Sequence, residues 1–432
     1  MTTMEPNLMV GESLTKCPRY AAFDPLQPAQ IIDPYPILAR AREEAPIFYM
    51  DKHDLWVVTR REDVLAIYKD MATFSNGPAQ QPLTPKTQAV IERVGEAYGL
   101  PVDGSINALD PPVHLPLKRL VVSVFQKALS GMDNWLEARL EKLVDQFADV
   151  GEVDLVPSFN WPVTVGTVAH LIGASDDEAN RFKEWAENWF ELVGSSQLSN
   201  ERAEACWMGF VDFENWAYRC LEDRRKQPRE DLMSKLLNAQ REGANITDRE
   251  IVTNCIGMVA AGTDTTANSI GQMMYMLLSN PDQLKRVRDN SDLRPRVIEE
   301  VLRLRVPVRG VIKITTRDVE LGGVTLPKGA KIYVHIGSAN RDAAMFEHGD
   351  QFDIERPNAR KHLAFGAFNR ACVGAPLARM EMTKALDVLL RRLPGLRFAS
   401  DHHPLRYTES IIVPSLRSLR VAWDVVARST GV

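Results

Sequence analysis

A long helical pattern constrains the fold of this chain more than any other feature. The pattern opens at the capping box Thr247-Asp-Arg-Glu250 and runs to Asn280, where Pro281 follows. Apolar residues lie on most of its sides, namely Ile256, Met258, Val259, Ile270, Met273 and Met274. A helix that is apolar nearly all round is buried. We therefore interpret this segment as a long helix inside the protein.

A short polar stretch interrupts this pattern at residues 260–266, which read Ala-Ala-Gly-Thr-Asp-Thr-Thr. Glycine and threonine are poor residues for a helix interior, and a threonine hydroxyl can bond to the carbonyl one turn earlier and bend the helix. Asp264 and Thr265 place an acid beside an alcohol. Because local rules tend to break at functional sites, this stretch indicates a site. The alternative is a helix with some polar residues on a wet face.

The second informative stretch surrounds Cys372, which sits in a turn between Gly366 and Gly374. Arg370 precedes it by two positions, and a helical pattern follows through Leu377, Met380, Leu386 and Leu389. A helix N-terminus stabilises a thiolate through its backbone N–H groups and its partial positive charge. From these residues alone Cys372 can be a buried structural thiol, a nucleophile or a metal ligand.

Three separated motifs resemble those of the cytochrome P450 family, soluble bacterial class, and occur in the family's order. Phe365, Cys372 and Gly374 match the haem-binding loop, although Phe368 stands where the family has glycine. Residues 261–266 resemble the oxygen-activation motif. The pair Glu300 and Arg303 resembles the Glu-x-x-Arg motif, and supporting matches extend from Pro34 to the C-terminus.

The resemblance implies the fold and the cofactor site. It implies a mostly α protein with a small β region (α+β), in which residues 1–30 form an N-terminal extension and residues 31–432 a single haem domain. It also implies that the Cys372 thiolate ligates the iron of haem b. The residues implied to face the haem propionates are His114, Lys118, Lys313 and Arg370, with Lys118 and Lys313 in place of the family's usual arginines.

The same resemblance assigns roles to residues away from the cysteine loop. Asp264 is implied to help deliver protons, and Thr265 to hold a hydrogen-bonded water. Glu300, Arg303 and Arg356 are implied to form a structural ion-pair network. Arg309 falls where such proteins often touch substrate, so it is a candidate for holding a substrate carboxylate. An arginine paired elsewhere in a strand is the alternative for Arg309.

The β region is predicted from period-two alternation and turn residues. Ile47–Met50 and Leu55–Thr59 read as two short strands, and three more lie between residues 311 and 336. Pro404–Val425 reads as further strands around Pro414. In contrast, residues 178–192 and 201–225 read as two amphipathic helices rich in aromatic residues.

Composition limits the compartment and the partners. The net charge of −5 carries no global signal for nucleic acid. Five scattered cysteines without a C-x-x-C, no signal-peptide pattern and no apolar run of membrane-spanning length predict a reduced, cytoplasmic protein without a membrane contact. No phosphate-binding glycine motif is present, so electrons are expected from a ferredoxin and its ferredoxin reductase. Basic residues near the cysteine can guide an acidic partner, namely Lys118, Arg119, Arg370 and Arg379.

The predicted function is a monooxygenase that inserts one oxygen atom of O2 into a small hydrophobic organic substrate, by hydroxylation or O-dealkylation. The main alternative is a non-catalytic haem-thiolate sensor or carrier, which needs no acid–alcohol pair. A cysteine-nucleophile hydrolase needs a histidine base and a third orienting group. A peroxide-driven relative is disfavoured because such enzymes typically lack the pair at Asp264 and Thr265. The substrate itself stays open among terpenoids, steroids, aromatics and fatty acids.

Overall fold

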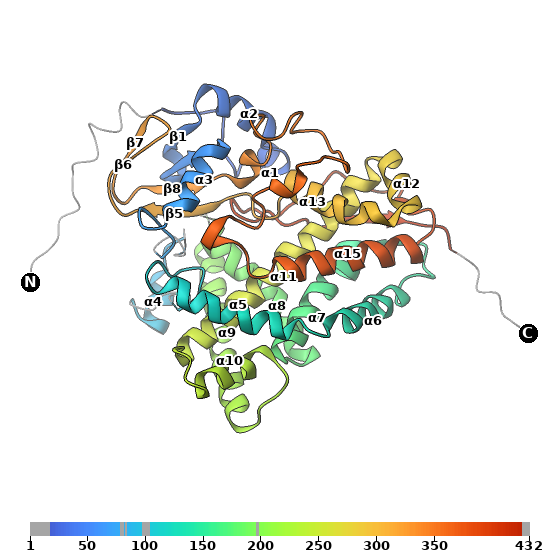
Figure 1. Ribbon diagram of the computed structural model, residues 1–432, viewed down its shortest axis with the longest axis horizontal. Helices are drawn as coiled ribbons and strands as arrows, with labels where there is room; N and C mark the ends of the chain where they lie inside the picture. The colour runs from blue at the N-terminus through green and yellow to red at the C-terminus, as the bar shows by residue number, and fades with distance from the viewer. Residues whose placement is uncertain (1–17, 78–81, 83, 97–103, 196–197, 426–432) are drawn as a thin grey trace, which may run out of the picture.

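The computed structural model describes residues 18–425 except 78–81, 83, 97–103 and 196–197. Helices make up most of it, and the strands β1, β5 and β8 gather at one side of the molecule together with α2 and α3 (Figure 1). The helices are α1 (Pro28–Ile32), α2 (Tyr35–Glu44), α3 (Arg61–Lys69), α4 (Gln88–Val94), α5 (His114–Ala128), α6 (Met132–Asp145), α7 (Trp161–Ile172), α8 (Asp176–Gly194), α9 (Asn200–Lys226), α10 (Leu232–Arg241), α11 (Asp248–Leu278), α12 (Pro281–Asp289), α13 (Arg294–Leu304), α14 (Ile336–Ala339) and α15 (Ala375–Arg392).

The strands form three small sheets. The largest has the order β1-β2-β8-β5-β3, from strands β1 (Ile47–Met50), β2 (Leu55–Val58), β8 (Lys331–Val334), β5 (Val311–Thr315) and β3 (Phe74–Ser75). In it β2 pairs with β8 in parallel, and β5 pairs with β8 antiparallel. The other two are the hairpin β6 (Val319–Leu321) with β7 (Val324–Leu326), and the sheet β4 (Glu152–Asp154), β10 (Arg420–Ala422) and β9 (Arg397–Phe398). The predicted mostly α fold with a small β region is confirmed.

Helix α11 is the predicted buried helix, and both predicted features of its start are present. The Thr247 hydroxyl accepts from the Glu250 backbone N–H, and the Glu250 carboxylate accepts from the Thr247 backbone N–H. The helix packs against α7, α8, α9 and α15. Its first half belongs to one apolar cluster, with α8, α9 and α10, and its second half to another, with α13 and α15. The polar stretch at residues 261–266 lies where these two clusters meet.

Both ends of the described part of the chain contain buried residues. Of the predicted N-terminal extension, residues 1–17 lie outside the described part, whereas residues 18–30 pack on the β region, where Phe23 is 3% exposed and contacts Phe48. The prediction of strands across residues 404–425 was wrong for most of that segment. Only Arg420–Ala422 is a strand, and an isolated bridge joins Tyr407 to Leu416. Around this bridge the backbone N–H of Thr408 donates to the carbonyl of Ser415 and that of Arg417 to the carbonyl of Arg406, both at 2.9 Å, while Pro414 and Leu416 bond to the side chain of Asn268 in α11.

No helix in the described part of the chain is both long and apolar enough to cross a membrane.

Candidate functional site

One face of the buried helix α11 is accessible. Ala261 is exposed, and Met258, Gly262 and Thr265 are partly exposed, while the residues around them are buried. These four positions share one side of a helix because they follow the spacing i, i+3, i+4, i+7. A Cβ on Gly262 would lie 2.9 Å from Val168 of α7, so glycine allows the two helices to approach closely. The accessible face therefore carries the alcohol of the predicted acid–alcohol pair.

The threonine hydroxyls of this stretch bond back along the helix, as the sequence suggested. The Thr265 Oγ1 donates to the carbonyl of Ala261 at 2.5 Å, and the Thr263 Oγ1 donates to the carbonyl of Val259 at 2.9 Å. A hydroxyl that donates its single hydrogen to a carbonyl keeps its lone pairs available as acceptors. Thr265 thus presents an acceptor on the accessible face of α11.

The side chain of Asp264 is buried, in contrast to that of Thr265. Its Oδ2 accepts a hydrogen bond of 2.5 Å from the hydroxyl of Ser415, and its Oδ1 is buried without a hydrogen-bond partner among the described residues. Burial raises the pKa of Asp264 to about 7, against a smaller opposing effect of the Ser415 hydroxyl. Such a carboxyl can both bind and release a proton near neutral pH.

The cysteine loop is shaped by two left-handed residues. Gly366 has φ 69° and Phe368 has φ 50°, and the backbone N–H of Cys372 closes the loop by donating to the carbonyl of Phe365 at 2.7 Å. Position 368 is where the resembled family has glycine, and the positive φ gives the physical reason, since only glycine adopts it without strain. The Phe368 side chain is 57% exposed.

Cys372 lies at the start of α15, and its surroundings act on the thiol in opposite directions. The residue is exposed, yet the protein packed around the thiol raises its pKa by desolvation. The backbone N–H groups of Gly374 and Ala375, together with the charges of Lys118 and Arg379, lower it. The arrangement supplies the positive groups that favour a thiolate, which a bound cation would stabilise further.

Four basic side chains converge beside this loop. His114 begins α5, Lys118 follows one turn later, Lys313 comes from β5, and Arg370 comes from the loop. Burial, followed by the charges of Arg370, Lys118 and Lys313, lowers the pKa of His114 to about 4. Burial lowers the pKa of Lys313 to about 7, and Arg370 contributes in the same direction. We call these four residues the cationic cluster.

The cationic cluster has little negative charge to balance it. Asp110 accepts from Arg370 Nη2 at 2.6 Å and is the acidic residue that raises the pKa of His114. Lys313 Nζ donates to the Asn76 side chain, and Lys118 Nζ donates to the carbonyls of Asn369 and Ala371 at 2.7 and 2.6 Å. His114 Nδ1 and Arg370 Nε are buried without a partner in the described part of the chain.

These observations fit a flat, dianionic cofactor held by a thiolate. Buried nitrogens without partners and an excess of basic side chains over acidic ones suit carboxylate groups. An exposed cysteine at a helix N-terminus suits a metal ligand, and an accessible helix face suits an apolar macrocycle. The predicted haem-facing residues His114, Lys118, Lys313 and Arg370 are thus brought together beside Cys372. Asp110 was missed, although it stands four residues before His114 and could have been noticed there.

The predicted ion-pair residues also come together. Arg303 donates to both oxygens of Glu300, with Nε–Oε2 at 2.7 Å and Nη2–Oε1 at 2.8 Å, and Arg356 Nε donates to Oε1 at 3.1 Å. Glu300 and Arg303 are 0% exposed. Arg303 donates further to backbone carbonyls of Asn340, Gly349 and Gln351. The group therefore fixes the loop that precedes the cysteine segment.

Arg309 lies apart from these groups. Its guanidinium donates to the carbonyls of Gln30 and Ile31 at 3.2 and 2.6 Å, stands over the ring of Tyr407 and is buried. This geometry favours the alternative of an arginine paired within the protein. Sequence could not separate the two, because the carbonyls that bind Arg309 are almost 280 residues away.

The basic residues expected to guide a redox partner are mostly engaged inside the protein. Arg370 pairs with Asp110, Lys118 bonds to loop carbonyls, and Arg379 donates to both oxygens of Glu299 at 2.6 and 3.0 Å. Arg119 is exposed. Of the four, Arg119 is the one whose charge faces solvent most fully.

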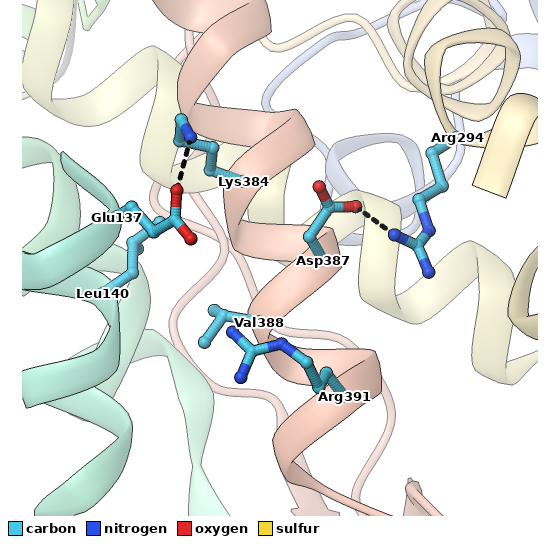
Figure 2. A pocket seen from close by; sticks show the side chains of 7 residues that line it. All are labelled: Glu137, Leu140, Arg294, Lys384, Asp387, Val388 and Arg391. Atoms are coloured by element: carbon cyan, nitrogen blue, oxygen red, sulfur yellow. Dashed lines mark hydrogen bonds and ion pairs between the residues drawn. The ribbon is translucent and has the colours of Figure 1, made fainter. Parts of the chain in front are cut away.

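A surface hollow between α6, α13 and α15 contains none of these groups. Figure 2 shows that charged side chains line it and pair with one another, Lys384 with Glu137 and Asp387 with Arg294. Arg391, which also lines the hollow, pairs with Glu141 beside it, so each charged side chain there has a partner and we assign the hollow no part in the site.

Known proteins resemble this chain over most of its length. The family model described as cytochrome P450 matches residues 197–394. Cytochrome P450 107B1 of Saccharopolyspora erythraea is 34% identical, over 89% of this chain and 93% of its own. The mycinamicin IV hydroxylase/epoxidase of Micromonospora griseorubida is 33% identical, over 86% and 90%. The crystal structure of the haem domain of a Tepidiphilus thermophilus P450 superposes with a TM-score of 0.86 at 30% identity, covering 94% of this chain and 98% of that one.

Sequence and structural similarity thus agree with the geometry of the cysteine loop, the cationic cluster and α11. The cofactor of such proteins is haem b, and their reaction uses O2 and a redox partner. This chain belongs to the cytochrome P450 family and is a bacterial-type cytochrome P450 monooxygenase.

Proposed function

We propose that the protein inserts one oxygen atom of O2 into a small hydrophobic organic substrate, by hydroxylation or O-dealkylation, in the cytoplasm. Electrons come from a ferredoxin and ferredoxin reductase, and residues 31–432 act as one haem domain. The observation that carries the proposal is the accessible face of α11, which presents Thr265 next to the buried acid Asp264. A carrier or sensor has no use for this pair.

The residues that hold the cofactor follow from their chemistry. The Cys372 thiolate ligates the iron, and the cationic cluster of His114, Lys118, Lys313 and Arg370 binds the propionates. Bound haem supplies the oxygen chemistry, in which one atom of O2 enters a C–H bond and the other leaves as water. The chain's task is to place the substrate, admit protons and limit water.

Two residues of α11 handle protons in this proposal. Because the Thr265 hydroxyl donates to Ala261, its lone pairs accept a hydrogen from a water held on the accessible face. Asp264, whose pKa burial raises to about 7, takes up and releases protons at neutral pH. The acid stays inside the protein while the alcohol faces the reaction space.

The accessible face also supports an apolar substrate. Met258, Ala261 and Gly262 provide no charge, and Thr265 provides one hydroxyl. Arg309, the charged candidate for a substrate carboxylate, already binds two backbone carbonyls. An uncharged hydrophobic compound therefore matches the described surface better than an acid, because a buried charge without a partner is strongly disfavoured.

The first test is the carbon monoxide difference spectrum of the reduced protein. We expect the red-shifted Soret band of thiolate-bound haem, and Cys372→Ser is expected to abolish it while haem still binds. A protein that purifies without haem would overturn the proposal.

The second test is turnover with a ferredoxin and its reductase, using a compound that shifts the haem spin state. Thr265→Ala and Asp264→Asn are expected to lower product formed per electron consumed. Spin-state shifts without any product, with every ferredoxin tried, would favour the sensor or carrier instead.

A further inference from the structure

A polar stripe on α11 fastens the C-terminal segment to the helix. Asp264, Asn268 and Gln272 are spaced four residues apart and so share one face. Asn268 donates to the carbonyl of Pro414 at 3.0 Å and accepts from the backbone N–H of Leu416 at 3.3 Å. Gln272 donates to the hydroxyl of Tyr407 at 2.8 Å. The segment 407–416 is therefore held in register along the helix that carries the acid.

Ser415 stands in the middle of this contact and is fixed from both sides. Its backbone N–H donates to the Thr408 hydroxyl at 2.8 Å, and its own hydroxyl lies 2.5 Å from Asp264 Oδ2 and 3.4 Å from the carbonyl of Val413. Both Ser415 and Asp264 are buried. The serine oxygen thus has two acceptors within reach but a single hydrogen to give.

We propose that Ser415 is the positioning residue for Asp264, a role that rests on the proton-delivery function proposed above. When Asp264 is ionised, Ser415 donates its hydrogen to Oδ2. When Oδ2 carries the proton, that O–H donates to the Ser415 oxygen, and the serine hydrogen turns to the carbonyl of Val413. A hydrogen bond thus joins Ser415 to Asp264 Oδ2 in both protonation states, and only its direction changes. The carboxyl therefore keeps its position in both states.

The charged side chains near Asp264 do not hold its carboxyl in place, so a neutral residue does. From the elements packed against it, the charged side chains that act on the acid are Glu187 and Lys183 of α8, which influence its pKa in opposite directions. Asp264 takes part in no ion pair within the described residues. The Ser415 hydroxyl is the contact that favours the ionised form, whereas burial favours the protonated one.

The test is an infrared titration of the Asp264 carboxyl in the resting holoprotein. The protonated C=O band is identified as the one that disappears in Asp264→Asn. In Ser415→Ala we expect its titration midpoint to rise by about one pH unit, since a hydrogen bond to the charged form is lost. Ser415→Cys keeps a weak donor, so its shift is expected to be smaller.

Ser410→Ala is the matched control. Ser410 lies in the same segment, is buried, and accepts from the backbone N–H groups of Ile412 and Val413. Its removal disturbs the segment without a contact to Asp264, and we expect the wild-type midpoint. We also expect Ser415→Ala, but not Ser410→Ala, to lower product formed per electron.

Two failures can be told apart. A wild-type midpoint in Ser415→Ala, or an equal shift in Ser410→Ala, would overturn the role of Ser415 whatever the activity. Full coupling of electrons to product in Asp264→Asn would instead overturn the proton-delivery role of Asp264, whatever the infrared result for the serine variants.

Discussion

The buried network around Glu300 allows a sharp prediction about stability. Its carboxylate accepts four hydrogen bonds, two from Arg303, one from Arg356 and one from the backbone N–H of Asp353. Three of them reach Oε1, so Glu300→Gln keeps these if its carbonyl takes that place. Its amide then points at Arg303 Nε, where two donors meet and no acceptor remains.

The burial of Arg303 determines how much stability Glu300→Gln should lose. Arg303 is 0% exposed, so its charge cannot be solvated by water once the carboxylate is neutral. Removing one partner of a buried ion pair typically costs about 3–5 kcal/mol. We expect Glu300→Gln to lower the free energy of unfolding by about 4 kcal/mol, measured by urea denaturation with far-UV circular dichroism and Soret absorbance followed together.

Asp289→Asn serves as the control for this prediction. Asp289 pairs with Lys285 at 2.6 Å, at i and i+4 on an exposed helix face. Water and salt screen such an exposed pair, so it contributes little to stability. If Glu300→Gln destabilised the protein no more than Asp289→Asn, the network around Glu300 would not be a main support of the fold.

Three further predictions rest on single residues. Burial raises the pKa of Glu381 from 4.5 to about 8, so the folded protein keeps a proton that the unfolded chain has lost. The free energy of unfolding of the wild type therefore falls as the pH rises from 4.5 to about 8. Measured by urea unfolding, Glu381→Gln should be more stable than the wild type by on the order of 4 kcal/mol at the upper pH and equally stable at the lower pH. Phe368→Gly removes a side chain held at φ 50° and should raise the free energy of unfolding by about 1 kcal/mol. It should also shift the haem reduction potential, measured by redox titration. An unchanged potential would show that the ring lies clear of the thiolate. Lys313→Ala should release haem to an acceptor protein about tenfold faster, whereas Lys313→Arg should not, because the charge is retained.

Local patterns predicted the helical part of this fold well. The capping box at Thr247 and Glu250 marks the true start of α11, because its hydrogen bonds join residues only three positions apart. The four basic residues of the cationic cluster were also predicted, from the resemblance to a family. This prediction depended on sequence motifs, because the cluster combines residues from elements far apart in the chain, such as α5 and β5.

Long-range contacts explain what the sequence could not predict. The Ser415 hydroxyl meets Asp264 across 151 residues, and no spacing rule connects the two. The C-terminal segment pairs with itself only at the bridge between Tyr407 and Leu416, and it also bonds to the side chain of Asn268 in α11, so a short bridge stands where sequence predicted longer strands. Pro414 also lacks the N–H that a ladder would need.

The order of the five-stranded sheet has a consequence for synthesis in the cell. Strand β2 pairs with β8, and next to this pair the backbone N–H of Arg61 bonds to Asp342, 281 residues later. At about 5–20 residues per second, the early strands leave the ribosome roughly 15 to 60 seconds before their partner exists. During that time the apolar edge of β2 has no partner and can pair with other chains. We therefore expect the yield of folded protein to respond to growth temperature and to chaperones that shield nascent chains.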